Sequence, residues 1–266
     1  MAHLRCDVFS DALGLSTSMT VLLPQRTSTQ IGMASASGEG PPPVLYLLHG
    51  LSDDDTTWVR RTSVERYAAP RGLAVVMPQV HRSFYSDEAL GGRYWTFLSE
   101  ELPELVASMF RVSSRREDTF VAGLSMGGYG ALKWALHAPE RFAAAASLSG
   151  VLDLVASHRR WSPPQAPRPE DPRLGERLFG GRDIAGGPED LLHLVGAADP
   201  TALPALYVAC GTEDALLDDN RAFLAVAERA GVPVRTDLGP GEHEWGYWDA
   251  RIQDVLAWLP LCPPAG

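Results

Sequence analysis

Residues 123–127 (GLSMG) place a serine between two glycines, where one sequence pattern gives way to another. Residues 119–122 before it form an apolar β-like run, and residues 131–136 after it have the apolar spacing of a helix. A G-x-S-x-G turn between a strand and a helix exposes its serine as a nucleophile. Its strained backbone needs small residues two positions before and after the serine. We therefore predict that Ser125 is a nucleophile, the alternative being a serine that only caps the helix.

A serine hydroxyl becomes reactive when a base accepts its proton, and a carboxylate must orient that base. In this architecture an acid and then a histidine follow the serine, each in a loop at the carboxyl end of a strand. Asp214 follows the apolar run 205–209, and His243 follows the run 234–238. We predict Asp214 as the acid and His243 as the base. Three nearby acids remain alternatives to Asp214, namely Glu213, Asp218 and Asp219.

The other histidines fit the role of base less well. Four of them do not follow a late strand, namely His3, His137, His158 and His193. His49 and His81 do follow strands, but they precede the serine. We expect His49 to brace its loop without transferring a proton.

Acyl transfer from an ester passes through an oxyanion that backbone N–H groups must stabilise. One donor is expected from Met126, the residue after the nucleophile. The second is expected from the loop after the apolar run 44–48, where Leu51 follows His49 and Gly50. The sequence has no H-E-x-x-H pattern and no close His/Asp/Glu cluster, so we expect neither a metal nor a cofactor.

Several aromatic residues are candidates to line a substrate pocket, although such side chains more often belong to the core. These candidates are Trp58, Tyr85, Trp95, Trp161 and Trp245.

The remaining pattern predicts the elements that must hold these residues. Apolar runs without alternation indicate strands covered on both faces; they occur at 44–48, 73–77, 119–122, 142–148 and 205–209. A last strand is expected over 234–238. Helices are expected after residue 126 and over 63–69, 100–110, 220–230 and 245–259. This alternation predicts an α/β fold with a mainly parallel central sheet and helices on both faces.

Three segments fall outside that alternation. Residues 4–10 and 18–24 alternate polar and apolar side chains around Gly14, which predicts an antiparallel hairpin at the sheet edge. Residues 26–43 are expected to form a loop. Residues 159–190 are rich in Pro and Gly and predict an irregular insertion, which we interpret as a small cap over about 155–200 beside the site. We expect residues 1–266 to form one domain.

The composition of the chain bears on which classes of binding partner are expected. The net charge of -10 disfavours nucleic acid and anionic membranes, so the expected partner is a small molecule. The widely spaced Cys6, Cys210 and Cys262 predict no disulfide framework. No apolar run approaches the roughly 18 residues of a membrane helix, and a cytoplasmic location is expected by default. The sequence does not decide whether the chain forms a homo-oligomer.

With these motifs in hand, the chain resembles the esterase D/tributyrin-esterase group of α/β-hydrolases. That group includes S-formylglutathione hydrolases, acetyl and feruloyl esterases and, more distantly, mycolyltransferases. The resemblance runs from about residue 44 to 260, through LLHGLSD (47–53), EELPELV (100–106), FVAGLSMGGYGALK (120–133), CGTEDALL (210–217) and GEHEWGYW (241–248). It implies an α/β-hydrolase fold with Ser125, Asp214 and His243 as catalytic residues and the amides of Leu51 and Met126 as oxyanion donors.

Two departures bear on the substrate. Formylglutathione hydrolases usually have a cysteine in the first oxyanion loop and an aromatic pair soon after a His-Ser, whereas this chain has SDD at 52–54 and HEW at 243–245. The resemblance therefore favours a serine carboxylesterase acting on short-chain acyl esters. An S-formylglutathione thioesterase or an acyltransferase is the alternative. Residues 1–43 and 159–190 carry little of the resemblance.

Overall fold

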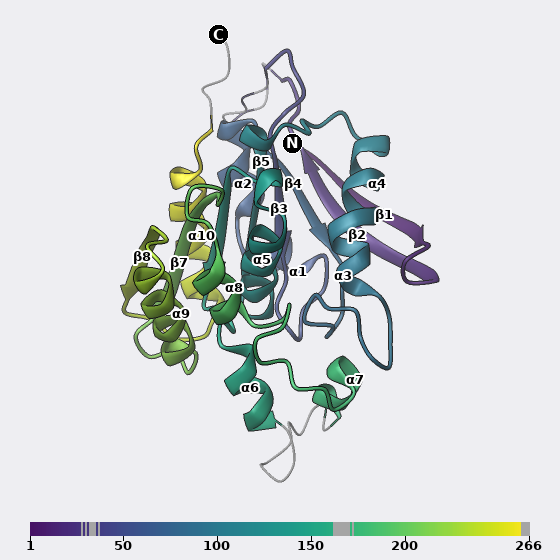
Figure 1. The fold of residues 1–266 in the computed structure, drawn as a ribbon. Helices are drawn as coiled ribbons and strands as arrows, with labels where there is room; N and C mark the ends of the chain where they lie inside the picture. Colours follow the sequence, from purple (N-terminus) through teal and green to yellow (C-terminus); the bar gives the residue numbers. More distant parts are fainter. Residues whose placement is uncertain are drawn as a thin grey trace.

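The computed structural model describes residues 1–27, 29, 31, 36, 38–161, 171 and 173–261, with only the backbone of Trp161. Its eight strands form one sheet in the order β1-β2-β4-β3-β5-β6-β7-β8 (Figure 1). The β1–β2 and β2–β4 pairs are antiparallel, and the other five are parallel. The predicted mainly parallel sheet with an antiparallel hairpin at one edge is confirmed. The strands are β1 (Ala2–Ser10), β2 (Leu15–Leu23), β3 (Val44–Leu48), β4 (Ala74–Pro78), β5 (Thr119–Leu124), β6 (Ala144–Leu148), β7 (Ala205–Gly211) and β8 (Val234–Gly239).

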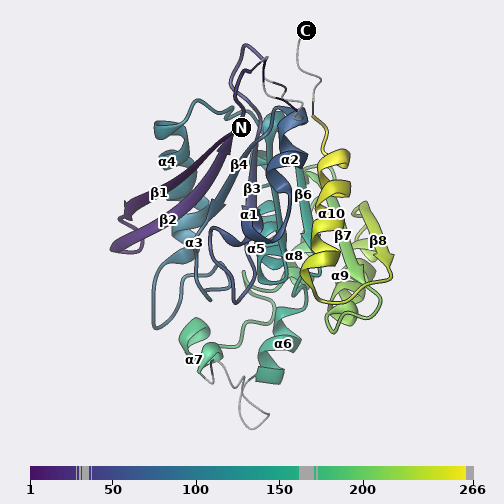
Figure 2. The same ribbon diagram turned by 180° about the vertical axis from the view of Figure 1, so that it is seen from behind.

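Helices cover both faces of this sheet, as predicted. Figure 1 shows α4 (Leu102–Met109), α5 (Met126–His137) and α8 (Leu191–Ala197) in front of it, and α9 (Leu217–Arg229) packs on the same face. Figure 2 shows α1 (Thr57–Arg61), α2 (Val64–Ala68) and α10 (Trp245–Trp258) on the other. Val44, Tyr46 and Leu48 of β3 point into the first core, and Leu45 and Leu47 point into the second. Two apolar cores explain why β3 shows no alternation.

Some helices begin at other residues than the sequence predicted, and others were not predicted. The helix predicted over 100–110 begins earlier, with α3 (Tyr94–Thr96) and a π-helical turn (Phe97–Glu101) before α4. The short helix α1 and the helix α8 were not predicted. Asp190 caps α8 by accepting hydrogen bonds from the backbone N–H groups of Leu192 and His193, a signal that the surrounding Pro and Gly residues obscured.

The stretch predicted as an irregular insertion is partly helical. The helices α6 (Leu154–Trp161) and α7 (Leu174–Phe179) lie beyond the carboxyl ends of the parallel strands (Figure 1). Backbone hydrogen bonds of 3.0 Å join α7 to Ala89 and Leu90. Residues 162–170 and 172, and part of the loop predicted over 26–43, lie outside the described residues. Within the described ranges, no helix combines the length and the apolar character needed to cross a membrane.

The turn from β5 to α5 is held by close contact between backbones. Ser125 has φ of 53° and ψ of -118°, a conformation that a non-glycine residue rarely adopts. A Cβ on Gly123 would overlap the carbonyl of Gly127, and a Cβ on Gly127 would overlap the carbonyl of Leu48 at the end of β3. The glycines that the sequence pattern requires are therefore required by the sheet as well.

We predict that Gly127→Ala lowers the free energy of unfolding by about 3 kcal/mol, because its methyl group must push α5 away from β3. Urea denaturation measures this change. Gly196→Ala is the matched control, since Gly196 also lies in a helix and its added Cβ would meet only a side-chain methyl of Val226 at 3.2 Å. Equal stability of the two variants would contradict the proposed contact.

Candidate active site

The structure brings the three predicted polar side chains into one line of hydrogen bonds. Ser125 lies at the start of α5, Asp214 in the loop after β7, and His243 in the loop after β8. The Ser125 hydroxyl and His243 Nε2 are 3.1 Å apart, and His243 Nδ1 lies 2.8 Å from Asp214 Oδ2. With Nδ1 donating to the carboxylate, Nε2 is left as the acceptor for the serine proton.

Asp214 is set up to stay ionised. Burial alone would raise its pKa, but hydrogen bonds from His243 and from the Leu216 amide, which is 2.8 Å from Oδ1, bring the pKa below its ordinary value. A carboxylate at this point can orient the imidazole beside it and stabilise the positive charge that develops when the imidazole accepts a proton.

The alternative acids have other partners. Glu213 accepts a hydrogen bond from Gly241 N–H at 2.7 Å, and Asp218 pairs with Arg221. Asp219 accepts hydrogen bonds of 3.0 to 3.2 Å from Ser157 and Arg160 of α6. Asp214 is thus the acid that contacts His243.

His243 is also fixed by packing. The edge of its ring meets Trp248 with centroids 4.8 Å apart and an interplanar angle of 88°. Trp245 packs on Trp248 in the same way at 5.2 Å. These tryptophans are one turn apart on α10, so the first turn of this helix forms a wall behind the imidazole.

The loop after β3 forms a tight turn beside Ser125. Asp53 N–H donates to the Gly50 carbonyl at 3.2 Å, and Gly50 N–H donates to the Asp53 carboxylate at 3.2 Å. Leu51 lies inside this turn. Met126 is the first residue of α5, and the backbone N–H groups in the first turn of a helix have no partner within the helix. Leu51, Met126 and Ser125 all line the same cavity.

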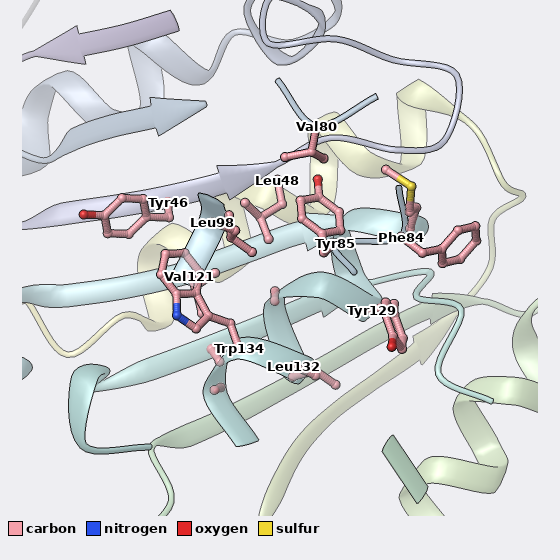
Figure 3. Close-up of a cluster of buried hydrophobic side chains, with 14 of the residues drawn as sticks. Tyr46, Leu48, Val80, Phe84, Tyr85, Leu98, Val121, Tyr129, Leu132 and Trp134 are labelled. Carbon is pink, nitrogen blue, oxygen red and sulfur yellow. The ribbon is translucent and has the colours of Figure 1, made fainter. Parts of the chain in front are cut away.

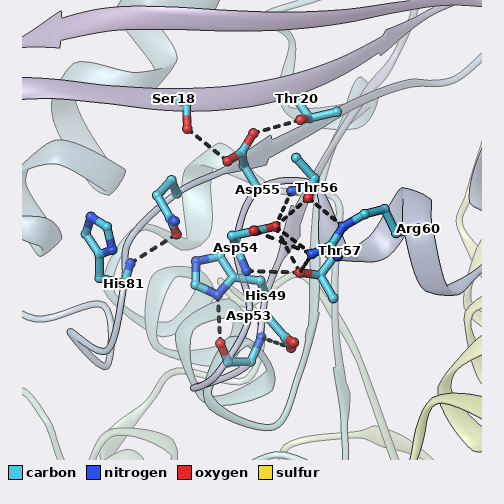
Figure 4. A network of polar contacts seen from close by, with 12 residues as sticks. Ser18, Thr20, His49, Asp53, Asp54, Asp55, Thr56, Thr57, Arg60 and His81 are labelled. Carbon is cyan, nitrogen blue, oxygen red and sulfur yellow. Dashed lines mark hydrogen bonds and ion pairs between the residues drawn. The ribbon is translucent and has the colours of Figure 1, made fainter.

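The loop carries three consecutive acids, Asp53, Asp54 and Asp55, which differ in their hydrogen-bond partners (Figure 4). Burial raises the pKa of Asp53. Burial also acts to raise the pKa of Asp54, but hydrogen bonds from Thr56 and Thr57 outweigh it and lower the value to about 2. Asp55 is 2% exposed and accepts hydrogen bonds of 2.8 Å from two hydroxyls of β2, those of Ser18 and Thr20. The loop is thereby tied to the N-terminal hairpin.

His49 is buried beneath the loop and bonded through both ring nitrogens. Its Nδ1 lies 2.7 Å from the Gly50 carbonyl, to which it donates, and its Nε2 accepts from Val80 N–H at 3.1 Å. Burial lowers the pKa of His49 to about 4. This neutral side chain braces the loop and does not contact Ser125.

The cavity over Ser125 has a volume of about 740 Å³. It has a polar side around Ser52, Asp53 and Arg82 and a largely apolar remainder that includes Trp245. The other lining residues are Gly50, Leu51, Phe84, Leu124, Ser125, Met126, Val151, Asp214, Ala215, Leu216, His243, Glu244 and Trp248.

Two aromatic residues predicted to line the pocket lie elsewhere. Trp58 and Tyr85 are both 0% exposed. Trp58 packs in the core under α10 and donates from Nε1 to the Leu48 carbonyl at 3.0 Å. Tyr85 donates its hydroxyl to the His49 carbonyl at 2.8 Å. Trp95 packs against Lys133 and His137 instead, and the side chain of Trp161 lies outside the described residues.

Sequence reasoning missed Trp248, Phe84, Val151 and Leu216 as lining residues. Trp248 could have been found, because it follows Trp245 at helical spacing just after His243. The other three are ordinary apolar residues in loops, and nothing in their type marks them. In the part of the chain that the structure covers, no three His, Cys, Asp or Glu side chains are grouped to hold a metal ion.

We predict that acid destabilises the protein partly through His49. As pH falls below about 6.5, the unfolded chain takes up a proton that the folded protein accepts only near pH 4, so up to about 3 kcal/mol of stability is lost across that window. Denaturation at pH 7 and pH 4.5 measures the loss. His49→Gln keeps a donor and an acceptor but does not titrate, so its stability should fall less over the same range.

Comparisons with known proteins fit this geometry. The sequence profile of the Esterase family matches residues 10–259. The fluorophosphonate-binding serine hydrolase F (FphF) of Staphylococcus aureus, solved with substrate bound, is 34% identical with a TM-score of 0.84, over 97% of this chain and 98% of that chain. S-formylglutathione hydrolase (FrmB) of the same organism is 33% identical with a TM-score of 0.80 and the same coverage.

An acetyl esterase of Caldicellulosiruptor saccharolyticus is 28% identical over 265 residues, which cover 97% of this chain and 98% of the relative. The family match and these relatives each span nearly the whole chain. This chain belongs to the Esterase family and is a serine hydrolase.

Proposed function

We propose that the protein is a carboxylesterase that hydrolyses short-chain acyl esters through an acyl-enzyme intermediate. The observation that carries this proposal is the line of contacts from Ser125 through His243 to the buried Asp214, 3.1 Å and 2.8 Å long. A serine, an imidazole and a carboxylate in this order are the groups that acyl transfer requires.

In the first half of the reaction, Ser125 Oγ attacks the ester carbonyl while His243 Nε2 takes its proton. The imidazolium that forms lies against the Asp214 carboxylate, whose lowered pKa keeps it charged. The N–H groups of Leu51 and Met126 are proposed to stabilise the oxyanion. His243 then returns the proton to the leaving alcohol as the carbon–oxygen bond breaks.

In the second half, water attacks the acyl-enzyme with His243 again acting as base, and the carboxylic acid leaves as Ser125 regains its proton. The apolar wall of the cavity, which includes Val151, Leu216 and Trp248, suits an aliphatic acyl group. The short insertion between β6 and β7 supports a preference for short chains.

A thioesterase acting on S-formylglutathione is the second candidate. Its support is the 33% identity to the S-formylglutathione hydrolase of Staphylococcus aureus, which is no weaker than the 28% identity to the acetyl esterase. Against it stands SDD at 52–54, where formylglutathione hydrolases usually carry a cysteine.

We predict that Ser125→Ala lowers kcat on p-nitrophenyl butyrate by at least about 10⁴-fold and Asp214→Asn by about 10³-fold to 10⁴-fold, because the asparagine no longer favours the charged imidazole. Both variants should keep the native circular dichroism spectrum. Asp218→Asn is the matched control, since Asp218 lies four residues further on, in the first turn of α9, with its side chain 92% exposed. If Ser125→Ala retains activity, the proposed nucleophile is wrong.

We also predict that kcat/KM on p-nitrophenyl butyrate exceeds that on the dodecanoate ester and on S-formylglutathione. Initial rates measured side by side with Ser125→Ala as the blank test this order. A thioester preferred by orders of magnitude would replace the first candidate with the second. Faster turnover of dodecanoate would contradict the short-chain preference.

A further inference from the structure

The segment Val80–Ser86, which we call the bracing segment, follows β4 and is held in a strained conformation. Three of its non-glycine residues, His81, Phe84 and Tyr85, have φ of 50°, 50° and 51°. Bulky residues in the left-handed region persist only where the surrounding structure holds them there. The contacts that hold this segment therefore indicate what its shape is for.

The bracing segment holds His49 from both of its ends. Val80 N–H donates to His49 Nε2, and the Tyr85 hydroxyl donates to the His49 carbonyl at 2.8 Å. Figure 3 shows Val80 and Tyr85 on the same side of Leu48, the residue that ends β3. The next peptides along the chain are those of Gly50 and Leu51, which form the turn beside Ser125.

Tyr85 is itself fixed by α5. A Cβ on Gly130 would overlap the Tyr85 ring, so this glycine lets the ring lie against the helix. Lys133 Nζ, one turn further along α5, donates to the Tyr85 carbonyl at 2.9 Å. The helix α5, which begins next to Ser125, thus also holds Tyr85, whose hydroxyl bonds the loop after β3.

Lys133 is kept in place by a buried counter-ion. Its side chain is 2% exposed, and its ammonium lies 2.5 Å from the carboxylate of Glu189 and 4.5 Å from the centre of the Trp95 ring. Glu189 also accepts hydrogen bonds of 2.8 Å from Ser86 and Tyr129. A buried ion pair adds little net stability, but removing either partner leaves an uncompensated buried charge and is strongly destabilising. The pair therefore keeps Lys133, and with it the bracing segment, in one position.

We infer that Tyr85 is a positioning residue for the oxyanion loop. Its hydroxyl fixes the His49 carbonyl, in the peptide just before the Gly50–Leu51 peptide, and His49 Nδ1 in turn holds the Gly50 carbonyl of that second peptide. The Leu51 N–H is thereby positioned through His49, while Lys133 and Glu189 fix Tyr85. The inference rests on the proposed function, in which the Leu51 N–H stabilises the oxyanion. An oxyanion donor acts mainly in the transition state. Loosening it should therefore lower kcat and leave KM nearly unchanged.

The experiment compares Tyr85→Phe with Tyr129→Phe. Both tyrosines are 0% exposed, and each substitution removes one buried hydroxyl and keeps the ring. The Tyr129 hydroxyl bonds Glu189 and not the oxyanion loop, and in Figure 3 the two hydroxyls point away from each other. Tyr129→Phe therefore controls for damage to the same buried cluster.

On p-nitrophenyl butyrate we expect Tyr85→Phe to lower kcat about tenfold, since a misplaced donor loses part of the 10²-fold to 10³-fold that complete removal costs. KM should stay within about twofold. Inhibition by butylboronic acid, whose tetrahedral adduct carries an oxygen at the oxyanion position, should weaken by a similar factor. Tyr129→Phe should leave kcat and boronate inhibition unchanged, even where its thermal unfolding midpoint falls as far as that of Tyr85→Phe.

An unchanged kcat in Tyr85→Phe overturns the inference. So does an equal loss of kcat in both variants, because that result assigns the cluster a structural role only. Failure of the proposed function looks different: the unsubstituted protein would then neither turn over the ester nor be labelled at Ser125 by a fluorophosphonate probe.

Discussion

The approach of the α5 backbone to the end of β3 is the constraint on which the site depends. Gly127 lies so close to the Leu48 carbonyl that even a methyl group does not fit between them. This contact places the first turn of α5 directly beside the loop after β3, with Ser125 in its strained conformation at the junction. Met126 and the turn around Leu51 then line one cavity. Without this approach, the proposed nucleophile and its two candidate oxyanion donors would belong to separate regions.

The rest of the molecule holds the loop after β3 from three directions. Asp55 ties it to β2 through two hydroxyls, His49 ties it to the bracing segment, and Tyr85 ties it to α5. All three anchors are buried, where hydrogen bonds are costly to break. The proposed acid and base, by contrast, come from two loops at neighbouring strand ends, where Gly211 of β7 lies close to the backbone of Gly241. The loop after β3 is thus held by buried hydrogen bonds, whereas the loops after β7 and β8 are held by close contact between their backbones.

Chain order and sheet edges made much of this arrangement predictable. The carboxyl ends of parallel strands lie at one edge of a sheet, so residues just after 119–122, 205–209 and 234–238 were expected to lie close together. In the sheet these segments belong to parallel strands, with β6 between the first two. Side-chain type did not reveal which way an aromatic residue points. Trp58 and Tyr85 looked like lining residues and are buried supports, whereas Trp248 was overlooked and contacts His243. The placement of Tyr85 depends on a positive φ angle that leaves no pattern in the sequence, whereas the helical spacing after Trp245 did mark Trp248.

The contact between Gly127 and Leu48 also bears on how the protein acquires its reactivity during folding. Leu48 and Gly127 are far apart in the sequence, and β3 and β5 pair in parallel, so a crossover through β4 and α4 must close before they meet. Until it closes, nothing forces Ser125 into its strained geometry. On the proposed role of Ser125, a nascent or partly folded chain is therefore expected to carry an unactivated serine. Covalent labelling of Ser125 during refolding would consequently report the moment at which the centre of the sheet assembles.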